Sequence, residues 1–341
     1  MTDFATVPES EQTARLGHLA ARALEAWDLG SADLALVKYR ENAVFAVTTE
    51  GGARRVLRVH RAAYRSDDDV RSEIAWTRAL AASGIHTPEF VATRRGDFLS
   101  HASVDGVPGV RQCDLMEWVD GSPLGSLEHG VALDDDGIRR TYATIGELAA
   151  RVHAHGEAWP RPAGFSRPVW DVASLVGEAP AFGAFWELDV LDAGQRALLL
   201  RVRDGVRARL AGLGTPRLLV HGDLIPDNVL VAHAGVRVID FDDCGAGSWV
   251  LELATSVFPL LISGGFDAGV AGFLDGYERV RPVPEDEREL LPAMIVARGL
   301  SYLGWPVGRP EIHSQREIAP LYAAGMCELA ERWLSGLCPS G

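Results

Sequence analysis

The apolar positions of the N-terminal part of the chain follow first a helical and then a strand-like period. Between residues 10 and 28 they recur at steps of three and four, which predicts an amphipathic helix. A second helix is predicted over 70–83, behind the acidic run 67–69, because carboxylates favour a helix start. Short runs rich in β-branched residues, separated by turn residues, predict an antiparallel meander with strands at 34–37, 44–48, 55–60, 89–93 and 112–118.

The remainder of the chain is patterned mostly as helix. A long helix is predicted from the acidic run 134–136 to residue 155, followed by an irregular stretch rich in proline, glycine and tryptophan at 156–182. Only two short apolar runs, 218–220 and 236–239, interrupt the helices that follow. These further helices are predicted at 191–212, 249–262, 266–280, 285–303 and 316–335. The pattern therefore predicts an α+β protein, with a β-rich N-terminal part and a mostly helical C-terminal part.

Composition and charge narrow the class of partner. Hydrophobic residues make up 47% of the 341 residues and charged residues 23%, which is ordinary globular usage. A core can therefore form without a disulfide or metal staple. Acidic residues outnumber basic ones, 47 to 33, giving a net charge of −14. A nucleic-acid-binding protein needs a basic surface for phosphates, so we expect no nucleic-acid partner.

The cysteines and apolar runs indicate a cytoplasmic protein that does not enter a membrane. None of the four cysteines stands in C-x-x-C spacing, which favours free thiols in a reducing compartment. Residues 1–12 lack the apolar stretch of a secretory signal. No apolar run approaches the ~18 residues that a bilayer span requires.

The segment that carries chemistry is His221-Gly222-Asp223-Leu224-Ile225-Pro226-Asp227-Asn228, followed by Asp240 after the run 236–239. Its spacing is H-x-D-x-x-x-x-N, and each half is flanked by a short apolar strand. Phosphoryl transfer needs a carboxylate that orients the acceptor hydroxyl. It also needs hard oxygen ligands for the Mg²⁺ that offsets phosphate charge. The pattern predicts Asp223 and Asn228 on one loop, with Asp240 opposite them.

With these residues in place, the chain resembles the aminoglycoside phosphotransferase and choline kinase superfamily, whose fold is that of the protein kinases. Within it, the chain is most similar to the group of stress-response kinase A and type II homoserine kinases. The resemblance runs from Tyr39 to about Arg309. It rests on the segments 41–45, 56–61, 71–73, 116–121, 221–228 and 239–243. It implies a two-lobed protein-kinase-like fold: a nucleotide-binding lobe at 1–115, a hinge at 116–121 and a helical catalytic lobe at 122–341.

The resemblance also implies roles in the catalytic lobe. Asp223 would be the catalytic base or the residue that orients the acceptor hydroxyl, and Asn228 and Asp240 would hold Mg²⁺. His221 is expected to be structural, packed under the loop and bonded to backbone. Asp242 and Asp243 could face a cationic substrate group or could be solvated surface carboxylates.

The nucleotide, ATP or GTP, would by the same resemblance sit between the lobes. Its base would bond to hinge backbone, at Glu117 and Val119 in the segment that starts at Met116. Because backbone reads the base, the sequence does not decide between ATP and GTP.

The phosphates would meet a cation and the first turn of the sheet. Arg58 stands where kinases carry a lysine on the third strand, and Glu73 would pair with it. Lys38, the only lysine in the chain, ranks below Arg58 because it lies on the first strand. A G-x-G-x-x-G loop is missing, so backbone amides and Asn42 would contact the phosphates.

The chain departs from the protein-kinase pattern in the catalytic segment as well. Ile225 replaces the usual loop lysine, and no long activation segment follows Asp240. These two departures favour a small-molecule acceptor, in a pocket to which three residues at helical spacing could contribute: Arg298, Tyr302 and Trp305. Glu252 is a departure from the family's own pattern, because it stands where the family usually has aspartate.

We therefore predict a Mg²⁺-dependent phosphotransferase that acts on a hydroxyl of an antibiotic, an amino alcohol or a homoserine-like metabolite. A Ser/Thr protein kinase of the stress-response type and a nucleotide-binding pseudokinase remain as alternatives. The acceptor's identity and the oligomeric state stay open.

Overall fold

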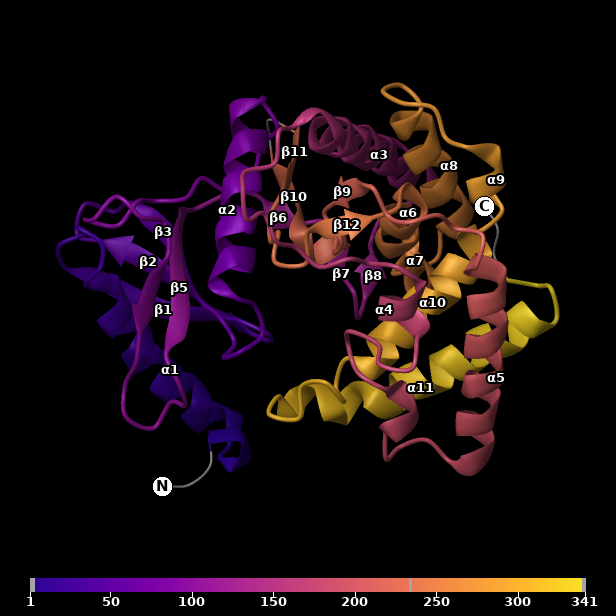
Figure 1. Cartoon of the computed structure of the whole chain (residues 1–341), viewed down its shortest axis with the longest axis horizontal. Helices are drawn as coiled ribbons and strands as arrows, with labels where there is room; N and C mark the ends of the chain where they lie inside the picture. Colours follow the sequence, from indigo (N-terminus) through magenta and orange to yellow (C-terminus); the bar gives the residue numbers. More distant parts are fainter. Residues whose placement is uncertain (1–3, 233–234, 339–341) are drawn as a thin grey trace. The chain divides into compact units, whose positions relative to one another are not determined.

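The structure, a computed structural model, describes residues 4–232 and 235–338. The chain divides into two compact units, whose elements are labelled in Figure 1. The first contains the described residues up to Val119 together with Pro162–Ser166 and Arg309–Ser314, and the second contains the remainder. The extreme ends of the predicted lobes, at residues 1–3 and 339–341, lie outside the described residues.

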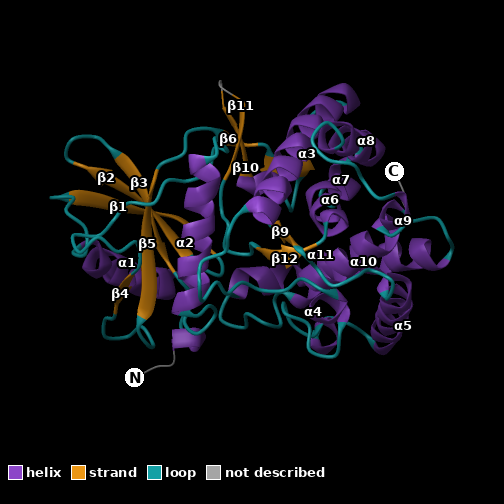
Figure 2. Cartoon of the chain, turned by 45° about the horizontal axis from the view of Figure 1, so that its top comes forward, coloured by secondary structure: helices purple, strands orange, loops and turns teal. Residues whose placement is uncertain are grey.

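The first unit is built on an antiparallel sheet, whose strands are orange in Figure 2. The order of its strands is β1-β2-β3-β5-β4. Buried and half-buried positions alternate along β2, and residues such as Phe45, Leu57 and Leu115 form the core of the unit. Opposite Arg58, the register puts Val44 on β2 and Asp114 on β5. The strands are β1 (Ala32–Tyr39), β2 (Ala43–Thr49), β3 (Arg54–Val59), β4 (Ser100–Ala102) and β5 (Arg111–Glu117).

The described helices of this unit are the short 3-10 helix η1 (Phe4–Thr6) and the α-helices α1 (Glu9–Leu24) and α2 (Asp67–Ala82). Helix α2 begins earlier than predicted, because Ser66 and Asp69 form a reciprocal capping box that places the acidic run inside the first turn. The strand predicted at 89–93 is wrong. Only an isolated bridge between Phe90 and Met116 forms there, since Pro88 lacks an N–H and Thr93 already begins a turn closed by Asp97.

The second unit is mostly helical, with short strands that support its loops. Its helices are α3 (Asp135–Ala158), α4 (Val172–Val176), α5 (Ala193–Leu210), α6 (Trp249–Val257), α7 (Leu260–Ser263), α8 (Phe266–Tyr277), α9 (Glu285–Arg288), α10 (Leu291–Gly304) and most of α11 (His313–Leu334). Its strands and 3-10 turns are β6 (Ser122–Pro123), β7 (Gly125–Ser126), β8 (Gly130–Val131), β9 (Leu218–Val220), β10 (Val229–Ala232), β11 (Gly235–Val238), β12 (Gly245–Gly247), η2 (Phe185–Glu187) and η3 (Pro226–Asn228).

Two helices predicted as continuous are broken. The helix predicted over 249–262 ends as α6 at Val257 and resumes as α7 after Pro259, and the one over 285–303 divides into α9 and α10, with Pro292 in the first turn of α10. In both places proline is tolerated at a helix start but not inside it. The α+β division itself is confirmed. Throughout residues 4–232 and 235–338, no helix combines the length and apolarity that crossing a membrane requires.

Candidate active site

The loop that carries Asp223 is held between two small sheets of the second unit. It leaves β9, which pairs with β12, and enters β10 through η3. Gly222 lies at a φ of +82°, and a Cβ there would come within 2.3 Å of the Asp243 carbonyl oxygen. Only glycine fits this turn, which brings the catalytic loop against the segment that follows Asp240.

Both carboxylate oxygens of Asp223 are held by neighbouring side chains. Asn228 donates from Nδ2 to Oδ2 at 2.9 Å, and also to the Asp223 carbonyl at 2.9 Å. Arg298 donates from Nη2 to Oδ1 at 3.1 Å. The Asp223 side chain nevertheless keeps 24% of its surface exposed. The carboxylate is therefore oriented while an edge of it remains accessible to an incoming hydroxyl.

His221 is a structural residue, as expected. Its Nε2 lies 3.0 Å from the Ile239 carbonyl and its Nδ1 accepts from the Asp223 amide at 3.3 Å. This pattern requires the neutral tautomer with the proton on Nε2. Burial lowers the pKa of His221, which keeps it in that form.

Glu252 on α6 braces the same loop. Its carboxylate accepts from the amides of His221, at 2.6 Å, and Gly222, at 3.2 Å, and contacts His153 at 3.2 Å. Burial works against its charge, but His153, His221 and the amide bond lower its pKa below the ordinary value. The longer glutamate therefore reaches the backbone amides of the loop from the place where the family usually has aspartate.

Asp240 is placed beside Asn228 by the β10–β11 hairpin. Val229 pairs with Val238, and the Ile239 amide donates to the Asn228 carbonyl at 3.0 Å, so Asp240 follows directly. Asp240 is exposed and holds a φ of +64°. Such left-handed conformations are uncommon outside glycine and gather at functional sites.

The donors at this place fit Mg²⁺. Asn228 uses its amide nitrogen on Asp223, which leaves its amide oxygen to bind a cation, and Asp240 follows Ile239, whose amide is bonded to the Asn228 backbone. Over residues 4–232 and 235–338, no three His, Cys, Asp or Glu side chains converge as a metal site. Mg²⁺ commonly takes only one or two protein oxygens and completes its shell with water and phosphate.

The short segment after Asp240 is fastened at its carbonyl groups. Arg167 donates to Cys244 at 2.7 Å and to Phe241 at 3.3 Å, and also bonds the Asp242 carbonyl. Trp170 donates to the Asp243 carbonyl at 2.7 Å. The Asp242 side chain is buried and that of Asp243 is half-buried. These contacts fix residues 241–244, although no long activation segment follows them.

In the first unit, Arg58 is the centre of a buried ionic cluster. Its Nη2 contacts Glu73 at 2.7 Å and Asp114 at 2.8 Å, and the Asp114 carboxylate also contacts His60 at 2.7 Å. The ion pair between Arg58 and Glu73 is the one expected from the sequence. Burial opposes the charge of Asp114, but Arg58 and His60 lower its pKa. Asp114 was not predicted from the sequence, although an acid between the buried residues Cys113 and Leu115 is a signal of pairing.

In the predicted hinge, some backbone amides donate hydrogen bonds and others do not. The Glu117 amide donates to Glu89 at 2.8 Å and the Trp118 amide to Arg54 at 3.2 Å. Among the described residues, no hydrogen bond occupies the Val119 amide. The Met116 side chain is half-buried. Of these three consecutive amides, 117 to 119, that of Val119 is the one without a hydrogen bond among the described residues.

Asn42 closes the turn between β1 and β2. It is 8% exposed, and its Oδ1 accepts from the Arg61 amide at 3.2 Å. This bond ties the turn to the end of β3. Lys38 lies on β1, where it pairs in register with Val44.

Helix α10 contributes to the site mainly through Arg298. The Arg298 guanidinium lies 4.4 Å from the ring centre of Tyr302 and 5.3 Å from that of Phe182. Tyr302 is half-buried against Phe258, at 5.3 Å between ring centres. Trp305 caps the C-terminal end of α10 and is half-buried. Arg298 is thus the member of this trio that contacts Asp223.

Comparison with known proteins decides the family. The model of the phosphotransferase enzyme family (APH) matches residues 35–290, more than half of the chain. The chain belongs to this family. The structure of a microcompartment-associated aminopropanol kinase is 30% identical, with a TM-score of 0.82 over 95% of this chain and 100% of that one. A homoserine kinase of Gluconobacter oxydans is 27% identical over 304 residues, 84% of this chain and 86% of the relative.

A more distant structure, an amicoumacin kinase in complex with AMP-PNP, Ca²⁺ and Ami, shares the fold. It is 17% identical, with a TM-score of 0.73 over 94% of this chain and 96% of that one. The family resemblance and the protein-kinase-like α+β fold predicted from the sequence are confirmed. The protein is a kinase-type phosphotransferase of small molecules with an alcohol group as acceptor.

Proposed function

We propose that the enzyme transfers the γ-phosphoryl group of ATP, with Mg²⁺, to the hydroxyl of a small alcohol that carries an amine. The observation that carries this proposal is the Asp223 carboxylate, which is held at both oxygens and remains partly exposed. A carboxylate in this state can accept the acceptor hydroxyl's hydrogen bond and align its oxygen for in-line attack.

The other residues divide the remaining tasks. Asn228 and Asp240 would hold Mg²⁺, which when bound offsets the charge of the phosphates. Arg58, fixed by Glu73 and Asp114, would supply positive charge to the phosphates. The Val119 amide would donate to the nucleobase.

Charge supports an amine on the acceptor. Asp242 and Asp243 follow Asp240 directly, and the Asp243 charge acts on both Arg298 and Tyr302. Arg298, the cation that contacts Asp223, is already neutralised by that carboxylate. An acceptor amine would therefore find the half-buried Asp243 carboxylate as a partner, whereas an acceptor carboxylate would find Arg298 already paired with Asp223. The likeness to the aminopropanol kinase supports the same preference.

A cytoplasmic location is part of this proposal. Each of the four cysteines is a free thiol, which a reducing compartment maintains: Cys113, Cys244, Cys327 and Cys338.

The test is a mass-spectrometric transfer assay with ATP and with GTP, each with and without Mg²⁺. The acceptor panel contains aminopropanol, ethanolamine, homoserine, hygromycin B, glycerol as the amine-free control, and casein as a protein substrate. We expect Mg²⁺-dependent phosphorylation of an amino alcohol from ATP, little transfer to glycerol, and none by the Asp223→Asn variant. Phosphorylation of casein alone would establish the protein-kinase alternative. Nucleotide binding without any transfer would indicate a pseudokinase.

A further inference from the structure

Arg298, a buried cation of helix α10, contacts the proposed catalytic carboxylate of Asp223. Arg298 is 1% exposed and donates through Nη2 to Asp223 Oδ1, at 3.1 Å, and to the Gly222 carbonyl, at 3.0 Å. The rings of Tyr302 and Phe182 enclose its guanidinium. Arg298 thus joins α10 to two consecutive residues of the catalytic loop.

A guanidinium this deeply buried must be compensated locally. Burying an unpaired cation costs several kcal/mol, so the pairing with Asp223 is what allows Arg298 to remain charged there. Burial opposes its charge, but Tyr302, Asp223 and Asp243 hold its pKa above the ordinary value. The positive charge beside Asp223 is therefore permanent.

The catalytic loop has no cation of its own next to Asp223. Ile225 is 3% exposed and occupies the position at which protein kinases usually carry a lysine. The charge that this position lacks is supplied from a distant helix, 75 residues along the chain from Asp223.

We propose that Arg298 is the positioning residue of the catalytic aspartate. It holds Oδ1 while Asn228 holds Oδ2, which fixes the plane of the carboxylate. Asp223 then presents its exposed edge to the acceptor hydroxyl in a single orientation, without reorganisation during transfer. This inference rests on the proposed role of Asp223.

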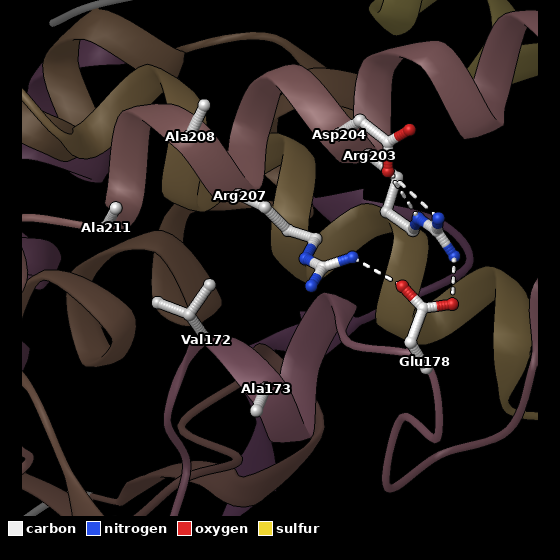
Figure 3. A pocket seen from close by; sticks show the side chains of 8 residues that line it. All are labelled: Val172, Ala173, Glu178, Arg203, Asp204, Arg207, Ala208 and Ala211. Carbon is white, nitrogen blue, oxygen red and sulfur yellow. Dashed lines mark hydrogen bonds and ion pairs between the residues drawn. The ribbon is translucent and has the colours of Figure 1, made fainter.

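The test compares Arg298→Met, which removes the charge and keeps much of the volume, with Arg298→Lys, which keeps the charge. The matched control is Arg203→Met on α5. Arg203 is 8% exposed, and its partners lie outside the catalytic loop: Asp204 at 2.9 Å, Glu178 at 3.7 Å and the Trp186 ring at 4.9 Å. It lines an open hollow of about 680 Å³ together with Arg207 (Figure 3).

Two readouts separate positioning from folding. The first is a comparison of kcat with the KM for ATP, measured with Mg²⁺ and aminopropanol. We expect Arg298→Met to lower kcat by about 10²-fold and to leave the ATP KM within about threefold, because only the orientation of the carboxylate is lost. Arg298→Lys should restore part of kcat, and Arg203→Met should change neither quantity.

The second readout needs no catalysis. Carboxyl carbons of aspartate are labelled with ¹³C, the Asp223 signal is assigned by its loss in Asp223→Asn, and its chemical shift is recorded by NMR at pH 7.5. The chemical shift should change in Arg298→Met, because the carboxylate is then held at one oxygen only, and it should stay as in the wild type in Arg203→Met.

The outcomes distinguish the two proposals. A near-wild-type kcat in Arg298→Met, or an Asp223 signal that stays as in the wild type, would overturn the role of Arg298. A changed Asp223 signal in a protein that phosphorylates no acceptor supports Arg298 and overturns the proposed function instead. Should Arg298→Met fail to fold, Arg298→Lys decides: a lower kcat at an unchanged ATP KM, with a changed Asp223 signal, supports the proposal, and a wild-type kcat with an unchanged signal overturns it.

Discussion

At the scale of single residues, Asp223 has its two oxygens tied to different elements, Oδ2 to Asn228 on η3 and Oδ1 to Arg298 on α10. We predict that Asp223→Ala lowers kcat by at least ~10²-fold and leaves nucleotide affinity nearly unchanged, because only the hydroxyl is oriented by this group. Single-turnover kinetics and calorimetric titration with AMP-PNP measure the two effects. Near-wild-type turnover would remove Asp223 from the mechanism.

Asp240 is expected to act through the metal. Replacing it with asparagine keeps the shape but removes the negative charge that a hard divalent cation favours. Asp240→Asn should abolish transfer and weaken the enhancement of nucleotide binding by Mg²⁺. Nucleotide affinity is measured with Mg²⁺ and with EDTA. An enhancement equal to that of the wild type would show that Asp240 is not a ligand.

Arg58 and Lys38 form a natural comparison, because both are cations of the same sheet. Arg58 is 3% exposed and held by Glu73 and Asp114, whereas Lys38 lies on the edge strand β1. Arg58→Ala should raise the KM for ATP and lower kcat, and Lys38→Ala should do neither strongly. Initial rates over a range of ATP concentrations check this. Reversed phenotypes would mean that the phosphate cation has been assigned to the wrong strand.

At the scale of elements, α3 and α8 approach so closely that glycines are required between them. A Cβ on Gly146 would lie 2.0 Å from the Phe273 carbonyl oxygen, and one on Gly276 would lie 1.8 Å from that of Ala143. Both contacts would be with backbone atoms, which cannot move away from an added Cβ as the end of a flexible side chain can. We predict that Gly146→Ala lowers the free energy of unfolding by about 1–3 kcal/mol, as overpacking does.

Gly325, inside α11, provides the control for this substitution. A Cβ there would meet nothing within 4 Å. Gly325→Ala should therefore stabilise the protein slightly, by about 0.5–1 kcal/mol, through helix propensity alone. Urea unfolding of both variants makes the comparison. Equal effects of the two substitutions would contradict the close approach of α3 and α8.

At the scale of the whole molecule, buried titratable groups predict a loss of stability in acid. Burial lowers the pKa of His221 below its ordinary 6.5, so the unfolded chain binds a proton that the folded protein rejects. Stability is therefore complete above pH 6.5 and falls as the pH drops below it. The pKa values of Glu252 and Asp114 lie below their ordinary values of 4.5 and 3.8. These two carboxylates therefore add a second loss of stability, which begins as the pH falls below about 4.5.

The measurement is the free energy of unfolding in urea at pH 7.5, 5.5 and 4. We expect it to decrease at each step. His221→Gln should reduce the difference between pH 7.5 and 5.5, because it removes the titrating group, whatever its effect on stability at pH 7.5. A stability that is constant or rising from pH 7.5 to 5.5 would contradict the neutral, buried state of His221.

Features that depend only on neighbours along the chain could be predicted from the order of residues. The spacing of Asp223 and Asn228 and the β-rich then helical order follow from local periodicity. The helix breaks at Pro259 and Pro292 were within reach of the same reasoning, which underweighted proline. The family was likewise readable, because its motif is a contiguous loop followed by one strand end.

Only the tertiary structure decided which distant side chains meet. Asp114 lies opposite Arg58 because β3 and β5 pair in one register, and a shift by a single residue would have turned it away. Glu252 reaches the amides of the catalytic loop, and Arg298 reaches Asp223, because α6 and α10 bring them there. Periodicity shows which face of a helix is buried but not what that face meets. For that physical reason the cation beside the catalytic carboxylate could not be found in the sequence.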